Sequence, residues 1–157
     1  LFSAKKLVFA TGLKDIMPNI KGFSECWGIT VLHCPYCHGY EVKNQKTGIL
    51  ANGYSAFHLA RLIRNWTKDL TIFTNGKSEL TQEQTDKIKG HNISIVEKEI
   101  TSLKHKNGVI EEIICSDNST FELKAIYSRP PFEQHSKIAE LFGCELTEQG
   151  LIKVDAF

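Results

Sequence analysis

Apolar runs of strand length alternate with a helical pattern in the first half of the chain. The runs cover residues 6–12, 47–51 and 70–73, and the first two end at or close to a glycine. Such runs are typical of the central strands of a parallel sheet, which are buried on both faces. Between the last two runs, apolar residues recur at helical spacing over residues 54–66 and predict an amphipathic helix. Strand, turn, helix and strand within about thirty residues make one right-handed βαβ unit.

A polar helix and one more short strand follow. Thr81 with Gln84 three residues later is a capping-box signal, which predicts a helix that ends near Gly90. Residues 93–97 then predict another short strand. Both elements extend the parallel sheet and its helical layer.

From residue 100 onward the pattern is that of hairpins. Strand-like segments over residues 100–106, 109–115 and 120–127 are separated by Asn107-Gly108 and by residues 117–119, which are strong turn signals. The sequence therefore predicts an α/β fold, a Rossmann-like parallel sheet with helices and an antiparallel three-stranded β-meander.

The last part of the chain leaves this sheet. Pro130 and Pro131 cannot continue a central strand, because proline lacks the amide hydrogen that the ladder needs. After them we expect a short amphipathic helix over residues 136–142 and a strand over residues 151–154. This tail is expected to belong to a neighbouring domain.

Composition narrows the function classes. The chain has 157 residues, of which 41% are hydrophobic and 24% charged, with 19 Lys and Arg against 18 Asp and Glu. This balance is typical of one globular domain and speaks against a nucleic-acid partner. No apolar run approaches the roughly 18 residues of a membrane span, and the first residues carry no targeting pattern. We therefore expect a cytoplasmic protein with no membrane partner.

The cysteines indicate redox chemistry rather than a disulfide scaffold. There are five, and only Cys34 and Cys37 are closely spaced. An odd number with a single close pair does not fit a stapled secreted domain. In a reducing cytoplasm such a Cys-x-x-Cys pair is either redox-active or half of a metal site.

The segment His33-Cys34-Pro35-Tyr36-Cys37-His38-Gly39 favours the redox interpretation. Two thiols at this spacing can close a small disulfide ring at a helix start, where the helix N-terminus favours the thiolate of Cys34. His38 is placed to carry the proton that thiol exchange moves. A zinc site is the less favoured alternative, because no second cysteine or histidine pair stands at ligand spacing, and we expect no metal. A glutaredoxin-type fold is disfavoured because its later Thr-Val-Pro and Gly-Gly segments are absent.

A degenerate dinucleotide fingerprint, A-x-G-x-x-A, lies where the predicted strand 47–51 turns into the predicted helix. Such turns need small residues so that the backbone approaches the pyrophosphate and the helix amides face it. Gly53 and Ala56 meet these demands, whereas Ala51 is expected to strain the turn, because alanine does not take positive φ cheaply. An ordinary strand-to-helix turn is the alternative. The residues expected to hold the pyrophosphate are Ala51, Asn52, Gly53, Tyr54, Ser55 and Ala56.

The end of the next predicted strand bears on which nucleotide binds. An acidic residue there would hold the ribose 2′-hydroxyl of NAD, but residues 74–78 contain no carboxylate and one cation. This favours NADP, with Thr74, Asn75 and Lys77 as candidate contacts. NAD is the alternative cofactor, and Lys77 as a solvated loop lysine is the alternative interpretation.

The order of these motifs resembles the low-molecular-weight thioredoxin reductases of the pyridine nucleotide-disulfide oxidoreductase family. A strand ending in Ala10-Thr11-Gly12 is followed by Cys-x-x-Cys, and then by the degenerate fingerprint. Residues 34–39 look most like the branch that includes dithiol oxidases of small disulfide metabolites. In the reductases proper an Asp commonly follows the second cysteine, where this chain has His38.

The resemblance implies a relay between three redox groups. NADPH would pass hydride to FAD, the flavin would reduce the disulfide through Cys37, and Cys34 would exchange with the substrate, with His38 as acid/base. The implied partner is a thioredoxin-like protein or a small-molecule disulfide, and the implied assembly is a homodimer.

The resemblance also implies a division of the chain. Residues 1–12 would be a remnant of an FAD domain, residues 13–130 the NAD(P)-binding and redox-dithiol domain, and residues 131–157 the return into the FAD domain. No Gly-x-Gly occurs in the sequence, so we expect a fragment that neither binds FAD firmly nor turns over by itself. The alternative functions are a nucleotide-binding module without chemistry and a zinc-binding domain.

Overall fold

The computed structural model of the protein describes residues 3–155. The chain forms two compact units. The larger unit spans Pro18–Arg129, and the smaller unit combines the residues up to Met17 with those from Pro130 onward. The Cys-x-x-Cys pair and the dinucleotide fingerprint both lie in the larger unit. The predicted domain boundaries remain a prediction.

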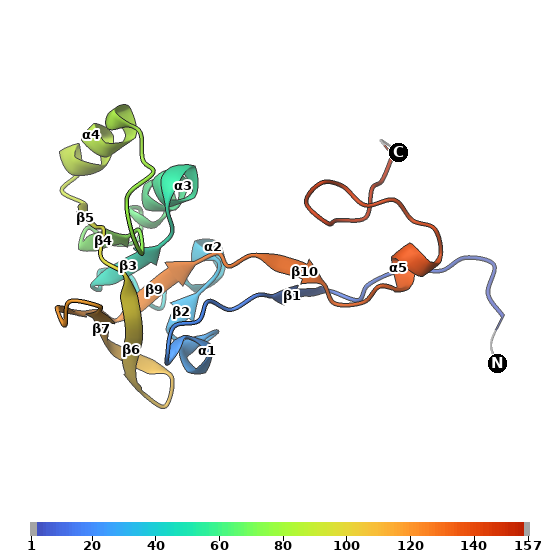
Figure 1. The fold of residues 1–157 in the computed structure, drawn as a ribbon, viewed down its shortest axis with the longest axis horizontal. Coiled ribbons are helices and arrows are strands. Elements are labelled where there is room, and N and C mark those ends of the chain that lie inside the picture. The colour runs from blue at the N-terminus through green and yellow to red at the C-terminus, as the bar shows by residue number, and fades with distance from the viewer. Residues whose placement is uncertain (1–2, 156–157) are drawn as a thin grey trace. The chain divides into compact units, whose positions relative to one another are not determined.

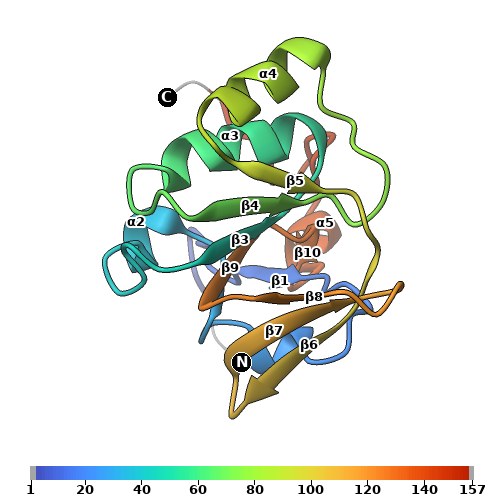
Figure 2. The same cartoon turned by 90° about the vertical axis from the view of Figure 1, so that its left-hand side faces the viewer.

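A five-stranded parallel sheet forms the centre of the larger unit (Figures 1 and 2), with the strand order β2-β9-β3-β4-β5. From β3 the chain order runs outward through β4 and β5 on one side, whereas β9 and β2 lie on the other side. Ligands of such sheets bind beyond the carboxyl ends of the strands, where the order reverses. The strands are β2 (Val31–Leu32), β3 (Thr47–Leu50), β4 (Leu70–Phe73), β5 (Ser94–Val96) and β9 (Ala125–Ser128).

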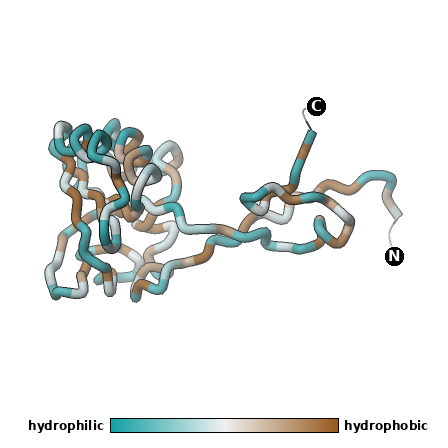
Figure 3. The backbone as a smooth tube through the Cα atoms, turned by 45° about the horizontal axis from the view of Figure 1, so that its top comes forward, coloured by the Kyte–Doolittle hydropathy of each residue, from teal (hydrophilic) through white to brown (hydrophobic). Residues whose placement is uncertain are grey.

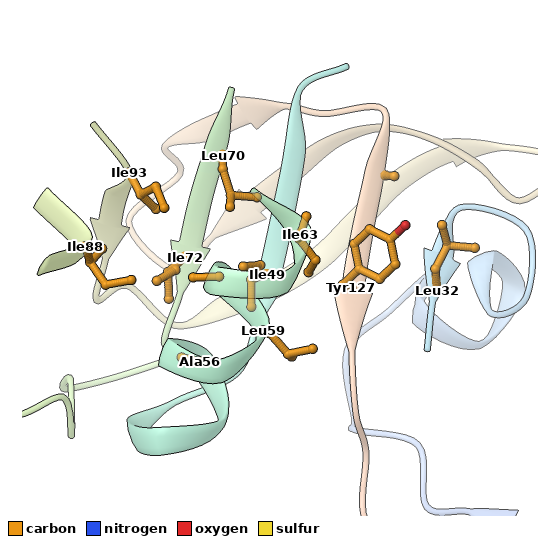
Figure 4. Packing of buried hydrophobic residues seen from close by; sticks show 12 residues of the cluster. Leu32, Ile49, Ala56, Leu59, Ile63, Leu70, Ile72, Ile88, Ile93 and Tyr127 are labelled. Atoms are coloured by element: carbon orange, nitrogen blue, oxygen red, sulfur yellow. The ribbon is translucent and has the colours of Figure 1, made fainter. Parts of the chain in front are cut away.

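Two helices lie side by side on one face of this sheet (Figure 2): α3 (Gly53–Ile63) and α4 (Gln82–Gly90). The predicted helix over residues 54–66 is confirmed, although its last three residues form a turn beyond Ile63. Figure 3 shows hydrophobic positions along the strands and hydrophilic positions recurring along the helices. Between helices and sheet lies one core (Figure 4), made of Leu32, Ile49, Ala56, Leu59, Ala60, Ile63, Leu70, Ile72, Ile88, Ile93, Ala125 and Tyr127.

The start of α4 confirms the predicted capping box. The Thr81 hydroxyl accepts a hydrogen bond from the Gln84 amide at 3.2 Å, and the Gln84 side chain accepts one from the Thr81 amide at 3.0 Å. These bonds satisfy two amides that would otherwise lack partners at the helix start. The helix ends at Gly90, as predicted.

The predicted antiparallel meander is also confirmed, with one correction. Its strands are β6 (Ile100–Lys106), β7 (Val109–Cys115) and β8 (Thr120–Glu122). The predicted third strand over residues 120–127 is wrong in its length, because the chain leaves the meander after Glu122 and continues as β9. All four residues of β9 are buried, as a central parallel strand requires, whereas β8 is largely exposed.

The meander packs on the sheet face opposite the helices. Side chains alternate between faces along a strand, so Gly48 and Phe73 point away from the core neighbours Ile49 and Ile72. The Phe121 ring of β8 meets the Phe73 ring edge-on, with centroids 5.2 Å apart. A Cβ at Gly48 would lie 2.8 Å from Leu123 Cδ1, so a larger residue there would make the Leu123 side chain shift.

The smaller unit pairs β1 (Leu13–Asp15) with β10 (Phe132–Gln134) in antiparallel fashion. The predicted helix over residues 136–142 is present as the shorter α5 (Ile138–Leu141). Phe142 follows this helix, and its ring centroid lies 6.2 Å from that of Phe9.

Two strands predicted for the smaller unit are wrong. Residues 6–12 are in no strand, and Leu7 and Val8 are 58% and 86% exposed. The strand predicted over residues 151–154 is reduced to a single bridge between Ile152 and Leu146. A strand forms only where backbone partners are available. Among residues 3–155 the first segment has one backbone hydrogen bond, from the His135 amide to the Gly12 carbonyl at its end, and the second has only this bridge. Within the same described range, every helix is too short or too polar to cross a bilayer.

Candidate functional site

The dithiol lies just beyond the carboxyl end of β2. Cys34 is the N-cap of α2 (Pro35–His38), a single turn with proline at its first position. The Cys37 thiol donates a hydrogen bond to Cys34 Sγ at 2.9 Å. Both cysteines are free thiols; Cys34 is half-buried and Cys37 is exposed. The pair is therefore accessible and placed for disulfide formation.

The two thiols have opposite pKa shifts. The hydrogen bond from Cys37 lowers the pKa of Cys34, and backbone amides at the start of α2 add to the effect. The positive charge of Arg129 lowers the same pKa further. The shared hydrogen bond raises the pKa of the donor Cys37, and the negative charge of Glu41 does so too. Cys34 is therefore the first thiol to ionise, and the thiolate is the form that attacks a disulfide.

The dithiol turn packs on the core through a contact between Gly39 and the Trp66 ring. A Cβ at Gly39 would collide with the Trp66 ring and with the Pro35 carbonyl oxygen, so only glycine fits at this position. Pro35 is buried beneath the turn. The glycine after the motif thus fixes how the thiols are presented, and Trp66 acts as a packing residue.

His38 is the last residue of α2 and its side chain is exposed. Its backbone amide donates to the Cys34 carbonyl at 3.2 Å. Among the side-chain hydrogen bonds of residues 3–155, only the bond from Cys37 reaches a thiol of the pair. The acid/base role of His38 remains a prediction.

Four segments of the site meet at one edge of the parallel sheet. Cys34 follows β2, Arg129 follows β9, Gly53 follows β3 and Thr74 follows β4. Because all these strands are parallel, their carboxyl ends lie at the same edge. Neighbouring strands are about 4.8 Å apart, so β2 and β3, which precede the dithiol and the dinucleotide turn and have β9 between them, lie roughly 10 Å from each other. The fold brings together two motifs that are separate in the sequence.

The turn between β3 and α3 has its left-handed residue at Gly53, with φ +53°. The expectation that Ala51 would strain the turn is wrong, because Ala51 is not among the residues with positive φ. Ala56 is fully buried in the core, as helix packing on the strand requires. Tyr54 and Ser55 are exposed in the first turn of α3.

Asn52 joins this turn to the loop after β4. Its Oδ1 accepts hydrogen bonds from the amides of Gly53 at 2.8 Å and Glu79 at 2.9 Å. Its Nδ2 donates to the Lys77 carbonyl at 2.9 Å. The two halves of the predicted nucleotide site are therefore fixed to each other by one side chain.

The three candidate ribose contacts differ in what they offer a ligand. Thr74 is buried, and its hydroxyl donates to the Gly76 carbonyl at 2.6 Å. The Asn75 side chain accepts a hydrogen bond from the Ile100 amide at 2.7 Å. Lys77 is exposed, and none of the ion pairs among residues 3–155 includes it. Lys77 is thus the only one of the three with a charged group free to meet a ligand.

Sequence reasoning missed Glu79 and Arg129. A Cβ added at Gly53 would lie 3.5 Å from Glu79 Oε2, so this carboxylate lies against the dinucleotide turn. The segment expected to contact the ribose ends at Ser78. The loop after β4 folds so that Glu79, the next residue, lies against the dinucleotide turn. Arg129 lies beside the dithiol because β9 pairs with β2. No local sequence pattern predicts this pairing.

A metal site is not built by these residues. Across residues 3–155, no three Cys, His, Asp or Glu side chains gather as metal ligands would. His33 and His38, the partners that the zinc alternative requires, are both exposed.

Comparison with known proteins finds relatives in one family of oxidoreductases. The family model for pyridine nucleotide-disulphide oxidoreductases matches residues 1–157. A thioredoxin reductase of Gibberella zeae is 32% identical over 98% of this chain and 54% of its own length.

Solved structures agree with this relationship. A protein assigned as thioredoxin reductase TrxB of Bacillus anthracis superimposes with a TM-score of 0.85 at 32% identity, covering 94% of this chain and 50% of that one. HlmI superimposes with a TM-score of 0.83 at 32% identity, covering 93% and 46%. The chain thus spans about half the length of the relatives it matches. A family model that covers the whole chain, together with these relatives, shows that it belongs to the pyridine nucleotide-disulphide oxidoreductases, as a member of the thioredoxin reductase type.

Proposed function

We propose that the larger unit is the nucleotide and dithiol domain of a flavin-dependent disulfide oxidoreductase, in which Cys34 and Cys37 are the redox pair. The observation that carries the proposal is the 2.9 Å hydrogen bond from Cys37 to Cys34, which favours the Cys34 thiolate. For the whole protein we propose a cytoplasmic homodimer that acts on a thioredoxin-like protein or a small-molecule disulfide.

The cysteine pair and a disulfide substrate can exchange two electrons without any further reactant. The Cys34 thiolate attacks one sulfur of the substrate disulfide, that S–S bond breaks, and the released thiolate takes up a proton. Cys37 then loses its proton and attacks the Cys34 sulfur of the mixed disulfide, which releases the second substrate thiol. Two electrons pass to the substrate and Cys34–Cys37 becomes a disulfide. The same steps in reverse oxidise a dithiol substrate.

FAD would exchange electrons with this pair in the whole protein. The larger unit has no second dinucleotide turn among its described residues, so we place the flavin site outside it. The exposure of Cys37 fits contact with a group from outside the unit. Reduction of the disulfide through Cys37 follows from the family resemblance and is part of the proposal.

Thiol titration of the protein tests the redox pair. After reduction and removal of the reductant, we expect mild oxidation to remove two titratable thiols and renewed reduction to restore both. Mass spectrometry should place the bond between Cys34 and Cys37. A nucleotide-binding module without chemistry would show no reversible loss, and a zinc domain would retain metal through dialysis and unfold on chelation.

A pyridine dinucleotide fits the backbone of the turn between β3 and α3, because Gly53 is left-handed and no atom lies closer than 3.5 Å to its Cβ position. The nucleotide would supply hydride when bound. The carboxylate of Glu79 bears on which nucleotide is preferred, since an acidic residue here can accept hydrogen bonds from ribose hydroxyls but repels a 2′-phosphate. We therefore propose NAD as the preferred cofactor in place of NADP.

Replacing Glu79 with glutamine is expected to shift the ratio of the NADH and NADPH dissociation constants about tenfold towards NADPH, because one charge-assisted hydrogen bond is lost and one repulsion is removed. Nucleotide fluorescence titration measures both constants. Glu83→Gln is the control, since Glu83 pairs with Lys87 on α4. An unchanged ratio in Glu79→Gln would refute the assignment of Glu79, and failure of the unaltered protein to bind either nucleotide would refute the nucleotide site.

Replacing Arg129 with glutamine is expected to slow alkylation of Cys34 about twofold near neutral pH. The charge of Arg129 lowers the pKa of Cys34, so its removal raises that pKa and reduces the thiolate fraction. Well above this pKa the thiol is ionised in both proteins, and their rates should converge. Iodoacetamide labelling followed by mass spectrometry measures the rate at Cys34, with Lys106→Gln as control. Equal rates across the pH range would show that Arg129 does not act on the thiol.

A further inference from the structure

A cavity of about 320 Å³ lies between α3 and α4, at the ends of these helices that are remote from the dinucleotide turn. Its lining includes Arg64, which caps the C-terminus of α3, whereas Gly53 begins that helix. At 1.5 Å per residue these two ends are about 16 Å apart. The Arg64 end of the cavity is therefore remote from the dinucleotide turn. The cavity lies between α3 and α4 and next to β5, at the opposite end of the strand order from β2, which the dithiol follows. Its volume is at the small end of the range of ligand pockets.

The floor of the cavity is apolar and its rim is cationic. Phe57, Ala60 and Ile88 supply apolar surface from both helices, as does Ile93 just before β5, and His91 adds an imidazole. Arg61, Arg64 and Lys87 supply the charges, and no acidic side chain lines the cavity.

The charges on this rim are incompletely paired within the described part of the chain. Lys87 is paired with Glu83 at 2.6 Å. The Arg61 guanidinium lies over the Phe57 ring, 5.8 Å from its centroid, and no ion pair among residues 3–155 includes either arginine. Arg64 Nε is buried and has no hydrogen-bond partner within the same residues. A buried donor without an acceptor is destabilising, so a ligand that places an acceptor at Arg64 Nε would remove this penalty.

The negative C-terminal ends of the two helix dipoles disfavour a bound anion in this cavity, but the positive side chains are the larger charge. Each helix C-terminus carries about half a negative charge. Two unpaired guanidinium groups exceed the sum of the two helix ends. A guanidinium also offers parallel N–H groups that match the two oxygens of a carboxylate.

We propose that the cavity between α3 and α4 binds a small organic monocarboxylate, with its apolar body against Ile88 and Ile93 and its carboxylate on Arg64 and Arg61. This is a second ligand site of the larger unit and does not depend on the proposed redox function. The ligand is defined by its chemistry, one planar anionic group on a compact apolar body.

Binding of 2-naphthoate to the full chain tests this site, measured by titration calorimetry and by amide chemical shifts. We expect saturable binding of one molecule, with shifts centred on residues 57–64 and 87–93. Arg64→Gln should weaken binding about tenfold, and Arg64→Lys should restore part of it because the charge returns. The neutral 2-naphthylmethanol should bind at least about tenfold more weakly than the acid.

The control variant is Lys106→Gln, which removes one positive charge from β6, away from the cavity. It should leave the naphthoate affinity unchanged. Equal binding of acid and alcohol, equal loss in Arg64→Gln and Lys106→Gln, or shifts confined to other elements would each overturn the proposal. Unchanged thermal midpoints of the unliganded variants will show that their fold is intact.

Discussion

Replacing Cys34 with serine is expected to lower the rate of thiol–disulfide exchange on the order of 10³-fold or more. A serine hydroxyl does not ionise near neutral pH and cannot form the mixed disulfide, so no other group at this position replaces the attacking sulfur. The reduced protein is mixed with the chromogenic disulfide 5,5′-dithiobis(2-nitrobenzoate), and the fast phase of thiolate release gives the rate.

The partner variant separates the roles of the two thiols. Cys37→Ser should still attack, since the Cys34 sulfur is present, but the mixed disulfide should persist because the resolving thiol is gone. Intact-protein mass spectrometry detects this adduct. In Cys37→Ala, which has no donor at this position, attack should also be slower than in the unaltered protein, because Cys34 loses the hydrogen bond that lowers its pKa.

Cys144→Ser is the matched control, because Cys144 is another accessible free cysteine and lies in the smaller unit. It should remove one slowly reacting thiol and leave the fast phase intact. Retention of the fast phase in Cys34→Ser together with its loss in Cys37→Ser would reverse the assigned roles of the two thiols. Retention in both variants would refute the redox pair.

Replacing Gly22 with alanine is expected to lower the free energy of unfolding of the larger unit by about 3 kcal/mol. Gly22 has φ +85°, which costs alanine about 1 kcal/mol. A Cβ at this position would also collide with the carbonyl oxygen of Leu103 on β6. The backbone cannot easily move away, since the Leu103 amide donates to the Lys21 carbonyl at 2.7 Å. Urea unfolding followed by tryptophan fluorescence measures the change.

Gly28→Ala is the matched control for this prediction. Gly28 has φ +76°, but nothing lies within 4 Å of its Cβ position, so alanine there meets the backbone strain without the collision. We expect a loss of about 1 kcal/mol for this variant. Equal losses in the two variants would show that the contact between Gly22 and β6 carries no energetic weight.

The sequence predicts well where local signals are strong. The β3-turn-α3-β4 unit and the cap of α4 combine apolar periodicity with glycine or hydrogen-bonding side chains, so they are found without tertiary information. The two-residue strand β2 and the one-turn helices α1 (Phe23–Cys26) and α2 are too short to show a period. Their positions follow from tertiary packing, for example that of Trp66 against Gly39.

The candidate site divides in the same way. Cys34 and Cys37 are recognisable from spacing alone, and so is Gly53 at the start of a helix. Glu79 and Arg129 are not, because each reaches the site through the fold, one by a loop held by Asn52 and the other by the pairing of β9 with β2. The predicted length of the third meander strand is wrong because the sequence has no turn residue near Leu123, where the chain leaves the meander and enters the parallel sheet.

The position of β9 has a consequence for assembly. Among the described strands, β2 pairs only with β9, and β9 also completes the connection to β3. The strand that leads to Cys34 can therefore pair only after β9 has been made. β9 follows more than ninety residues later in the sequence, and β3 to β8 lie between the two strands. Closing so long a loop is entropically costly and slow. The thiol turn thus gains its neighbouring strand only after β9 has been made. In a nascent chain that ends before Ala125, Trp66 can already pack against Gly39, but the strand that leads to Cys34 has no partner strand.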